Sequence, residues 1–337
     1  MEILFGVAGL IAAVFVVVFG GRGLVDLVRG ASERRGLRTA QRHEQTTTPL
    51  PTQDVRFTTT TDGVRIAYAV AGEGPAVFVI GQVTHVEVEW ESVLWRHWWA
   101  ELSRGHTLVR LDHRGVGLSD PSPEQYSNAD LVLDLEAVID AVGGPSVMLM
   151  GISKLGGTAA MEYAASHHEQ IKRLVLFGVQ TRGQRARGLE SVERPGIRML
   201  LERGWGRDDP AYRQLWNAMA VHVVPEATPE LLEAYREIFS AATSAEGLRH
   251  VIDALSAADM TETASKITAP TLVLHSRGDG FTRFEFGREV AALIPNARFV
   301  ALESNNHILT ADEPAFAVFA SEVHRFLDGP TAEESGT

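Results

Sequence analysis

Ser153 is the residue of this sequence best placed to act as a nucleophile. It follows an apolar run and Gly151 in the segment 147–157, which reads VMLMGISKLGG and is typical of a strand that turns sharply into a helix. A serine at such a turn is lifted clear of the sheet, and the helix N-terminus favours negative charge that develops beside it. The pattern predicts a nucleophilic serine. The competing interpretation is that Ser153 only caps the helix.

A serine hydroxyl is a weak nucleophile at neutral pH and needs a base, which a carboxylate orients. The sequence contains 12 histidines, and His307 differs from the others because it lies in a polar loop between an apolar run and the last amphipathic segment. Asp279 follows the apolar run 271–275 in the same way. We therefore predict a catalytic triad of Ser153, Asp279 and His307. A simple turn residue is the competing interpretation of Asp279.

Short apolar runs alternate with amphipathic segments from residue 54 onwards, and each triad residue follows one of these runs. The expected strands are 54–60, 64–70, 76–80, 107–111, 146–150, 173–177, 271–275 and 298–302. The expected helices are 91–104, 128–142, 158–167, 284–294 and 312–327. Strands that alternate with helices predict an α/β fold, with a mostly parallel central sheet and helices on both faces.

One long stretch interrupts this alternation between Phe177 and Thr271. It has helical character and no clear strand, and Thr228-Pro229 is a good helix start. We expect a helical cap over the sheet edge at about residues 183–263.

Further motifs accompany the triad. They read THVEVEW at 84–90, LDHRGVGLSD at 111–120, GIS at 151–153, GWG at 204–206, PTLVLHSRGD at 270–279 and NH at 306–307. With them the sequence resembles bacterial α/β-hydrolases of the type often fused to adenylate cyclase or transcriptional-regulator modules. The resemblance runs from about residue 54 to residue 327. It implies the α/β-hydrolase fold and hydrolysis through an acyl-enzyme, with no cofactor and no metal.

The resemblance also implies roles for main-chain groups. It places an oxyanion hole at the backbone N–H groups of Gln82 and Lys154, and such donors contribute about 2.7–4 kcal/mol each. It implies that Asp112-His113-Arg114-Gly115 is a structural turn.

The turn at the serine departs from the family pattern Gly-x-Ser-x-Gly, in which the residues two before and two after the serine are small. Gly151 meets the first condition, but Leu155 stands at the second position, and glycines follow only at Gly156 and Gly157. This looks like a one-residue insertion. A bulge would absorb it and leave the serine in place, whereas a distorted turn would weaken or abolish catalysis. The side chain of Lys154 either attracts an anionic substrate or is solvated.

The N-terminal region differs from the rest of the chain. Residues 3–21 carry no charge, and about 20 such residues span a bilayer. We expect a transmembrane anchor at 1–22 and a basic juxtamembrane segment with a linker at 23–53. By the positive-inside tendency, the arginines after the apolar run place the hydrolase domain, 54–327, in the cytoplasm. The polar tail 328–337 is expected to be disordered. A buried helix or a processed leader are the competing interpretations of the apolar run.

Composition narrows the function. A net charge of −12 disfavours nucleic acid as a partner, and the absence of cysteine excludes thiolate catalysis and disulfides. Epoxide hydrolases and dehalogenases of this fold carry Asp where Ser153 stands. We therefore expect a single-pass, membrane-anchored serine hydrolase of a small-molecule carboxylic ester, with a lipid-derived ester suggested by the anchor alone. The alternatives are a catalytically silent binding or sensor module and a cofactor-free, non-hydrolytic enzyme.

Overall fold

The computed structural model describes residues 49–81, 83–121, 127–144, 146–188, 203, 205 and 209–330. They belong to one compact unit, Thr48–Thr337, and the residues before it form a separate unit that lies outside the described part.

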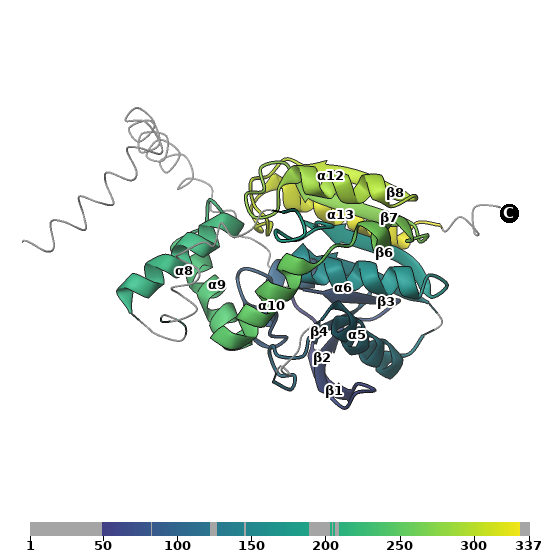
Figure 1. Ribbon diagram of the computed structural model, residues 1–337, viewed down its shortest axis with the longest axis horizontal. Coiled ribbons are helices and arrows are strands. Elements are labelled where there is room, and N and C mark those ends of the chain that lie inside the picture. Colours follow the sequence, from purple (N-terminus) through teal and green to yellow (C-terminus); the bar gives the residue numbers. More distant parts are fainter. Residues whose placement is uncertain are drawn as a thin grey trace, which may run out of the picture. The chain divides into compact units, whose positions relative to one another are not determined.

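An eight-stranded sheet forms the centre of the compact unit (Figure 1). Its strands are β1 (Gln53–Thr59), β2 (Arg65–Ala71), β3 (Ala76–Ile80), β4 (Thr107–Asp112), β5 (Val147–Ile152), β6 (Ile171–Phe177), β7 (Thr271–Ser276) and β8 (Ala297–Leu302). They lie in the order β1-β2-β4-β3-β5-β6-β7-β8. The β1–β2 and β2–β4 pairs are antiparallel, and the other pairs are parallel. The predicted mostly parallel sheet is confirmed.

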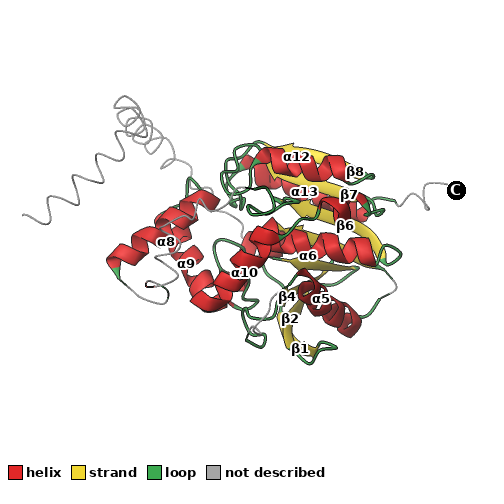
Figure 2. Cartoon of the chain, in the orientation of Figure 1, coloured by secondary structure: helices red, strands yellow, loops and turns green. Residues whose placement is uncertain are grey.

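Helices cover both faces of this sheet (Figure 2). The described helices are α3 (Val88–Glu91), α4 (Arg96–Leu102), α5 (Asn128–Val142), α6 (Ser153–Ser166), α8 (Pro210–Val223), α9 (Pro229–Ala242), α10 (Ala245–Ala257), α11 (Thr261–Ser265), α12 (Phe284–Leu293) and α13 (Pro314–Asp328). On one face α6 packs against α5 and α11, and α11 also contacts α12. On the other face Trp98 of α4 packs against Phe319 of α13, with ring centroids 4.4 Å apart.

The helix predicted at 91–104 is two helices, α3 and α4. The chain leaves the helical region at Ser92, whose φ and ψ are −65° and 135°, and the Ser92 hydroxyl accepts a hydrogen bond from the N–H of Leu94. This break lets Trp90 of α3 and Trp99 of α4 lie against the same buried guanidinium, that of Arg110. The spacing of apolar residues in the sequence fits one helix, but the shared contact of Trp90 and Trp99 with Arg110 is made from two helices.

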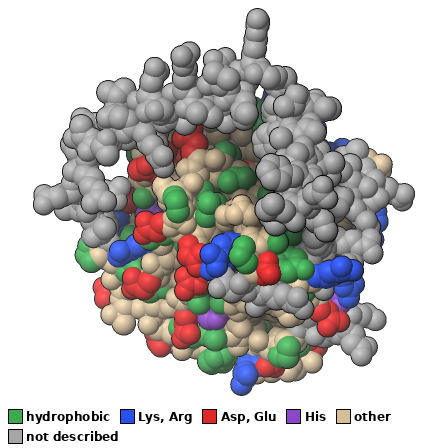
Figure 3. Space-filling view, turned by 90° about the vertical axis from the view of Figure 1, so that its left-hand side faces the viewer, with side chains coloured by type: hydrophobic (Ala, Val, Ile, Leu, Met, Phe, Trp, Pro, Cys, Tyr) green, Lys and Arg blue, Asp and Glu red, His purple; other side chains and the backbone are tan. Residues whose placement is uncertain are grey.

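Four described helices, α8, α9, α10 and α11, lie between β6 and β7 in the chain; α8 and α9 stand at the left of Figure 1, and α10 runs from them to α6. The connections before α8 and after α10 are joined where Arg182 pairs with Asp259 in an isolated antiparallel bridge. The N–H of Met260 also donates to the carbonyl of Thr181 at 2.7 Å. Figure 3 looks onto this side of the molecule, where acidic and basic side chains alternate with apolar ones over the described surface.

No helix in the described part of the chain is long and apolar enough to cross a membrane. The longest, α5 and α13, have 15 residues each. At 1.5 Å per residue they span about 22 Å, whereas the hydrocarbon core of a bilayer is about 30 Å thick.

Two predictions made from the N-terminal apolar run are corrected by this finding. The fold class is the α/β-hydrolase fold with no spanning helix among the described residues, and the single-pass membrane localisation is not supported. The anchor predicted at 1–22, the linker up to residue 48 and the tail from residue 331 lie outside the described residues. The prediction rested on apolar composition alone, and composition does not establish a spanning helix.

Candidate active site

Ser153 lies at a sharp turn between the last residue of β5, Ile152, and helix α6. Its φ is +62°, and it is the one described non-glycine residue with a positive φ. A left-handed conformation costs a non-glycine residue about 1–3 kcal/mol and persists only where the surroundings impose it. The residue is 2% exposed and lines a cavity. The strand and the helix therefore hold the hydroxyl in one position at the end of the sheet.

Leu155 does not interrupt the turn. Helix α6 is continuous from Ser153, and Leu155 is buried in the core. A Cβ at position 156 would lie 2.0 Å from the carbonyl oxygen of Ile80, and one at position 157 would lie 2.5 Å from Val179. Glycine is therefore required at 156 and 157, where the helix meets the ends of β3 and β6. Helix α6 therefore contains no bulge after Ser153, and the turn that the sequence pattern suggested to be distorted leads directly into the helix.

The three predicted triad residues lie together at the carboxyl edge of the sheet. The Nε2 atom of His307 is 2.8 Å from the Oγ atom of Ser153, and its Nδ1 atom is 2.6 Å from Oδ2 of Asp279. A carboxylate only accepts hydrogen bonds, which assigns the ring proton to Nδ1 and leaves Nε2 to accept from the serine hydroxyl. All three side chains are buried.

Asp279 is held as a carboxylate by its surroundings. Its Oδ1 atom accepts hydrogen bonds from the N–H groups of Phe281 and Thr282, each at 2.8 Å. Burial alone would raise the pKa of Asp279, but the charge of His307 and hydrogen bonds from His275, His307 and the Thr282 N–H outweigh it. The pKa therefore lies well below its usual range, and the group stays ionised beside His307.

Main-chain contacts fix the loop that carries His307. The N–H of His307 donates to the carbonyl of Val223, the last residue of α8, at 2.7 Å. Two residues further on, the carbonyl of Leu309 accepts from the Trp98 indole at 3.0 Å and from His97 Nε2 at 2.9 Å. Burial lowers the pKa of His97 to about 4, so His97 is neutral near pH 7 and donates without adding a charge.

Gly178 lies directly beside the His307 ring. It follows β6 with a φ of +63°, and a Cβ there would be 2.8 Å from Cε1 of His307. The absence of a side chain at this position leaves room for the imidazole.

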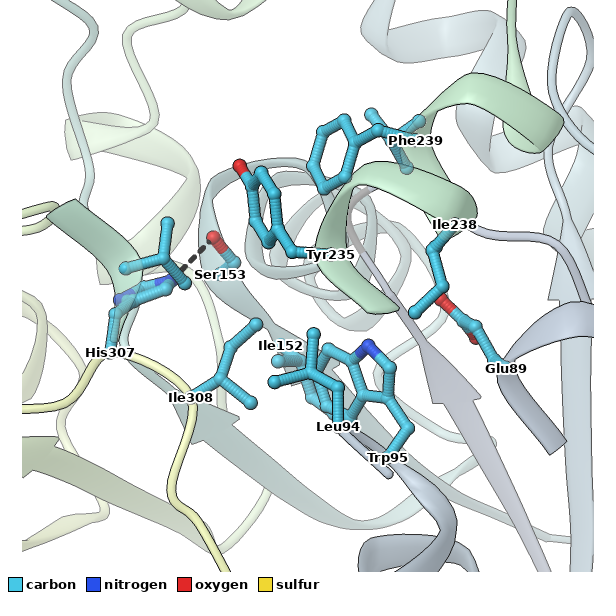
Figure 4. A pocket seen from close by; sticks show the side chains of 12 residues that line it. Glu89, Leu94, Trp95, Ile152, Ser153, Tyr235, Ile238, Phe239, His307 and Ile308 are labelled. Atoms are coloured by element: carbon cyan, nitrogen blue, oxygen red, sulfur yellow. Dashed lines mark hydrogen bonds between the residues drawn. The ribbon is translucent and has the colours of Figure 1, made fainter. Parts of the chain in front are cut away.

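The cavity in front of Ser153 is mostly apolar (Figure 4). It holds about 450 Å³ of space not filled by atoms, part of it open to solvent. The lining residues are Val83, Glu89, Leu94, Trp95, Ile152, Ser153, Val223, Tyr235, Ile238, Phe239, His307 and Ile308. Helix α9 supplies three of them and α8 one, so the helices between β6 and β7 close the cavity over the serine.

A family model described as the alpha/beta hydrolase fold matches residues 84–314. The chain belongs to this family. The match covers the serine, the aspartate and the histidine, and it confirms the family resemblance of the sequence. The lipid-derived substrate had no support besides the predicted anchor and is withdrawn with it.

Relatives of this α/β-hydrolase include other hydrolases. A 2-hydroxy-6-oxononadienedioate/2-hydroxy-6-oxononatrienedioate hydrolase of Cupriavidus pinatubonensis is 29% identical over 216 residues, which cover 59% of this chain and 72% of the relative. The esterase RhEst1 of Rhodococcus sp. ECU1013 is 26% identical, with a TM-score of 0.66, over 82% of this chain and 98% of the esterase. The enol-lactonase of Burkholderia xenovorans LB400 shares the fold with the same TM-score at 24% identity, over 81% of this chain and 100% of that enzyme. The relatives support a hydrolase.

The family resemblance implies an oxyanion hole formed by the main-chain N–H groups of Gln82 and Lys154, and the structure describes only the second of these residues. Gln82 lies outside the described residues. Lys154 is the second residue of α6, at the N-terminal end of the helix. Its ammonium group lies 4.3 Å from the centre of the Phe281 ring, which packs against His307 with ring centroids 4.8 Å apart. The lysine side chain therefore lies over an aromatic ring beside the histidine.

The turn after β4 orders neighbouring loops. The carboxylate of Asp112 accepts from the N–H groups of Val86 and Leu118 at 3.0 Å each. Arg114 pairs with Asp134 at 2.7 Å. None of the residues 112–115 lines the cavity or belongs to the triad.

Sequence reasoning missed Glu89, Tyr235 and Gly178. Glu89 lies between Val88 and Trp90 in the run VEVEW, which was a usable signal, because an acid next to large apolar residues is either solvated or specifically paired. Tyr235 carries no signal, since it fits an ordinary amphipathic helix. Gly178 directly follows an apolar run, but its contact with His307 depends on the tertiary structure.

Proposed function

We propose that the protein is a serine hydrolase that cleaves a small carboxylic ester through an acyl-enzyme. Ser153 is the nucleophile, His307 the general base and then the general acid, and Asp279 the residue that orients and stabilises the histidine. The helices at about 183–263 act as a cap within a hydrolase domain at 54–327. No cofactor is needed for this chemistry.

In the first step His307 Nε2 takes the hydroxyl proton as Ser153 Oγ attacks the ester carbonyl carbon. The tetrahedral oxyanion is stabilised by two main-chain N–H groups, that of Lys154 at the start of α6 and that of Gln82, which follows β3 in the chain. His307 then gives its proton to the departing alcohol. A water molecule, deprotonated by the same nitrogen, cleaves the acyl-enzyme and releases the acid.

The observation that carries this proposal is the unbroken row of hydrogen bonds from Ser153 through His307 to Asp279, with the serine facing an apolar cavity. An ester is favoured over a charged substrate, because the cavity is mostly apolar and its acidic residue, Glu89, is paired with Arg110. The dicarboxylate in the name of the Cupriavidus hydrolase would lose its hydration there without gaining an unpaired positive partner among the described residues that line the cavity. The similarity to the esterase RhEst1 supports the same choice.

Labelling with a fluorophosphonate probe tests the proposal. We expect the wild type to be labelled and to hydrolyse p-nitrophenyl butyrate, and Ser153→Ala to lose both properties. Ser166→Ala, an exposed serine at the other end of the same helix, is the matched control and should behave as the wild type. A folded wild-type protein without labelling or turnover on p-nitrophenyl esters of any chain length would contradict the proposal and favour a binding module.

A further inference from the structure

Glu89 is the acidic residue of the cavity and has no part in the triad. It lies on the short helix α3 and is 3% exposed. Figure 4 shows its carboxylate and the Ser153 hydroxyl on opposite sides of the cavity, with apolar and aromatic side chains between them. A buried carboxyl group is costly unless it is paired or bound, so its position calls for an explanation.

Arg110 donates a hydrogen bond to only one of the two carboxyl oxygens of Glu89. Its Nη1 atom is 3.3 Å from Oε2 of Glu89, and its guanidinium also donates to the carbonyl of Val86 at 2.6 Å and lies against Trp90 and Trp99. Arg110 is thus held by several contacts and does not line the cavity in front of Ser153. Among the hydrogen bonds of the described residues, the other oxygen, Oε1, takes part in none.

The charges around Glu89 limit what can bind there. Arg110 neutralises the Glu89 carboxylate, so the pair has no net charge and neither a substrate cation nor a substrate anion gains much from it, while either would lose its hydration in the apolar cavity. Burial raises the pKa of Glu89 to about 8, with Arg110 opposing the rise and Asp112 adding to it. Near neutral pH the Glu89 carboxyl group is therefore present in both its protonated and its ionised form. A hydroxyl group suits both, because it donates to a carboxylate and accepts from a carboxylic acid.

We propose that Glu89 is a specificity-determining residue, whose Oε1 atom binds a hydroxyl group at the far end of the substrate chain while the ester lies at Ser153. The inference rests on the serine-hydrolase function proposed above. It defines the substrate class as hydroxylated esters with an apolar middle section, which the aliphatic and aromatic side chains of the cavity contact.

Matched pairs of esters test this inference. One pair is p-nitrophenyl hexanoate and p-nitrophenyl 6-hydroxyhexanoate; the other, with the hydroxyl in the alcohol part, is hexyl acetate and the monoacetate of hexane-1,6-diol. The measured quantity is the ratio of kcat/KM for the hydroxylated ester to that for the plain ester. Two pairs are used so that either end of the ester can occupy the cavity.

The variants separate Glu89 from its partner. Removing Glu89 alone would leave Arg110 buried and uncompensated, so the test variant is Glu89→Leu combined with Arg110→Met, an apolar replacement of the whole pair that proteins tolerate well. Arg110→Met alone is the matched control, because it retains the carboxyl group. Glu89→Gln keeps a hydrogen-bonding group of the same shape.

We expect the ratio for one pair to fall at least about tenfold in the double variant, which corresponds to one lost hydrogen bond to a polar substrate group. Arg110→Met and Glu89→Gln should retain most of the preference. A ratio that stays within about twofold of the wild type in the double variant, for both pairs, would overturn the inference.

Failure of the inference is distinguishable from failure of the proposed function. Turnover of the plain esters reports on the triad alone. Binding of hexanamide and 6-hydroxyhexanamide to Ser153→Ala protein, followed by tryptophan fluorescence, reports on Glu89 without any reaction. Weaker binding of the hydroxylated amide after Glu89→Leu/Arg110→Met is introduced supports the inference even if no ester is cleaved, and unchanged binding contradicts it.

Discussion

Asp279 uses its two carboxylate oxygens for different purposes. The Oδ1 atom accepts from two main-chain N–H groups, and Oδ2 lies 2.6 Å from His307 Nδ1. The main-chain contacts fix the orientation of the carboxylate, and that orientation selects the tautomer of His307 in which Nε2 faces Ser153. At the residue scale, the proposed activity depends on an oxygen atom in this place that accepts a hydrogen bond and has none to donate.

Asp279→Asn tests this dependence. An amide of the same shape has no negative charge and can present an N–H group to Nδ1. Nδ1 then accepts a hydrogen bond, and the histidine adopts the tautomer with its proton on Nε2. We expect kcat to fall by about 10³–10⁴ while the protein stays folded. Glu303→Gln is the matched control, because this acid lies in the His307 loop but forms only an exposed ion pair with Arg277. A loss of less than tenfold in Asp279→Asn would contradict the assigned role.

At the scale of elements, the site is built from chain segments that leave the sheet at the same edge. Ser153 follows β5, Gly178 follows β6, Asp279 follows β7 and His307 follows β8. Parallel strands bring their carboxyl ends together, which is why open α/β sheets bind ligands at that edge. These segments approach one another closely only where the residues are small. At Gly178, an added Cβ would lie 2.8 Å from the His307 ring.

Gly178→Ala separates this contact from the conformational preference of glycine. Gly105 has a φ of +74° and open space where a Cβ would lie, whereas a Cβ at position 178 would meet His307. Both alanine variants should lose about 1–2 kcal/mol of unfolding free energy, because alanine disfavours a positive φ. Only Gly178→Ala should also lose at least about tenfold in kcat/KM. Equal kinetic effects in the two variants would show that the ring contact is unimportant.

At the scale of the whole molecule, ionisable groups buried near the site couple stability to pH in opposite directions. The pKa of Asp279 is lowered, so its contribution to stability is present above the unfolded-state value of about 3.9 and is lost as the pH falls through the folded-state pKa. The pKa of Glu89 is raised from 4.5 to about 8 by burial, so the folded chain retains a proton that the unfolded chain releases. Its contribution therefore declines as the pH rises through that window.

Urea unfolding of the wild type, Asp279→Asn and Glu89→Gln between pH 3 and pH 9 checks both signs. Relative to the wild type, Asp279→Asn should lose less stability on acidification below about pH 4. Glu89→Gln should show a weaker decline between pH 4.5 and about 8. Stability curves that run parallel to the wild type at every pH would rule out these two groups as the origin of the pH dependence.

The sequence by itself determined the fold and the positions of the triad candidates. Alternating strand and helix patterns define a parallel sheet, and residues that follow successive strands must meet at one edge, so Ser153, Asp279 and His307 were predictable without coordinates. The membrane anchor was predicted from composition alone, and no described helix supports a membrane span. The helix at 91–104 was predicted as one element because the apolar spacing does not show the turn at Ser92.

Only the tertiary structure decided what surrounds the triad. Leu155 fits because the close approach of α6 to β3 requires glycine at 156 rather than at 155. Glu89 of α3 pairs with Arg110 of β4, and α4 lies between these two elements in the chain. Gly178 follows β6 and lies beside His307, which follows β8. A sequence pattern reports the period of one element, whereas these contacts depend on how elements distant in the chain pack together.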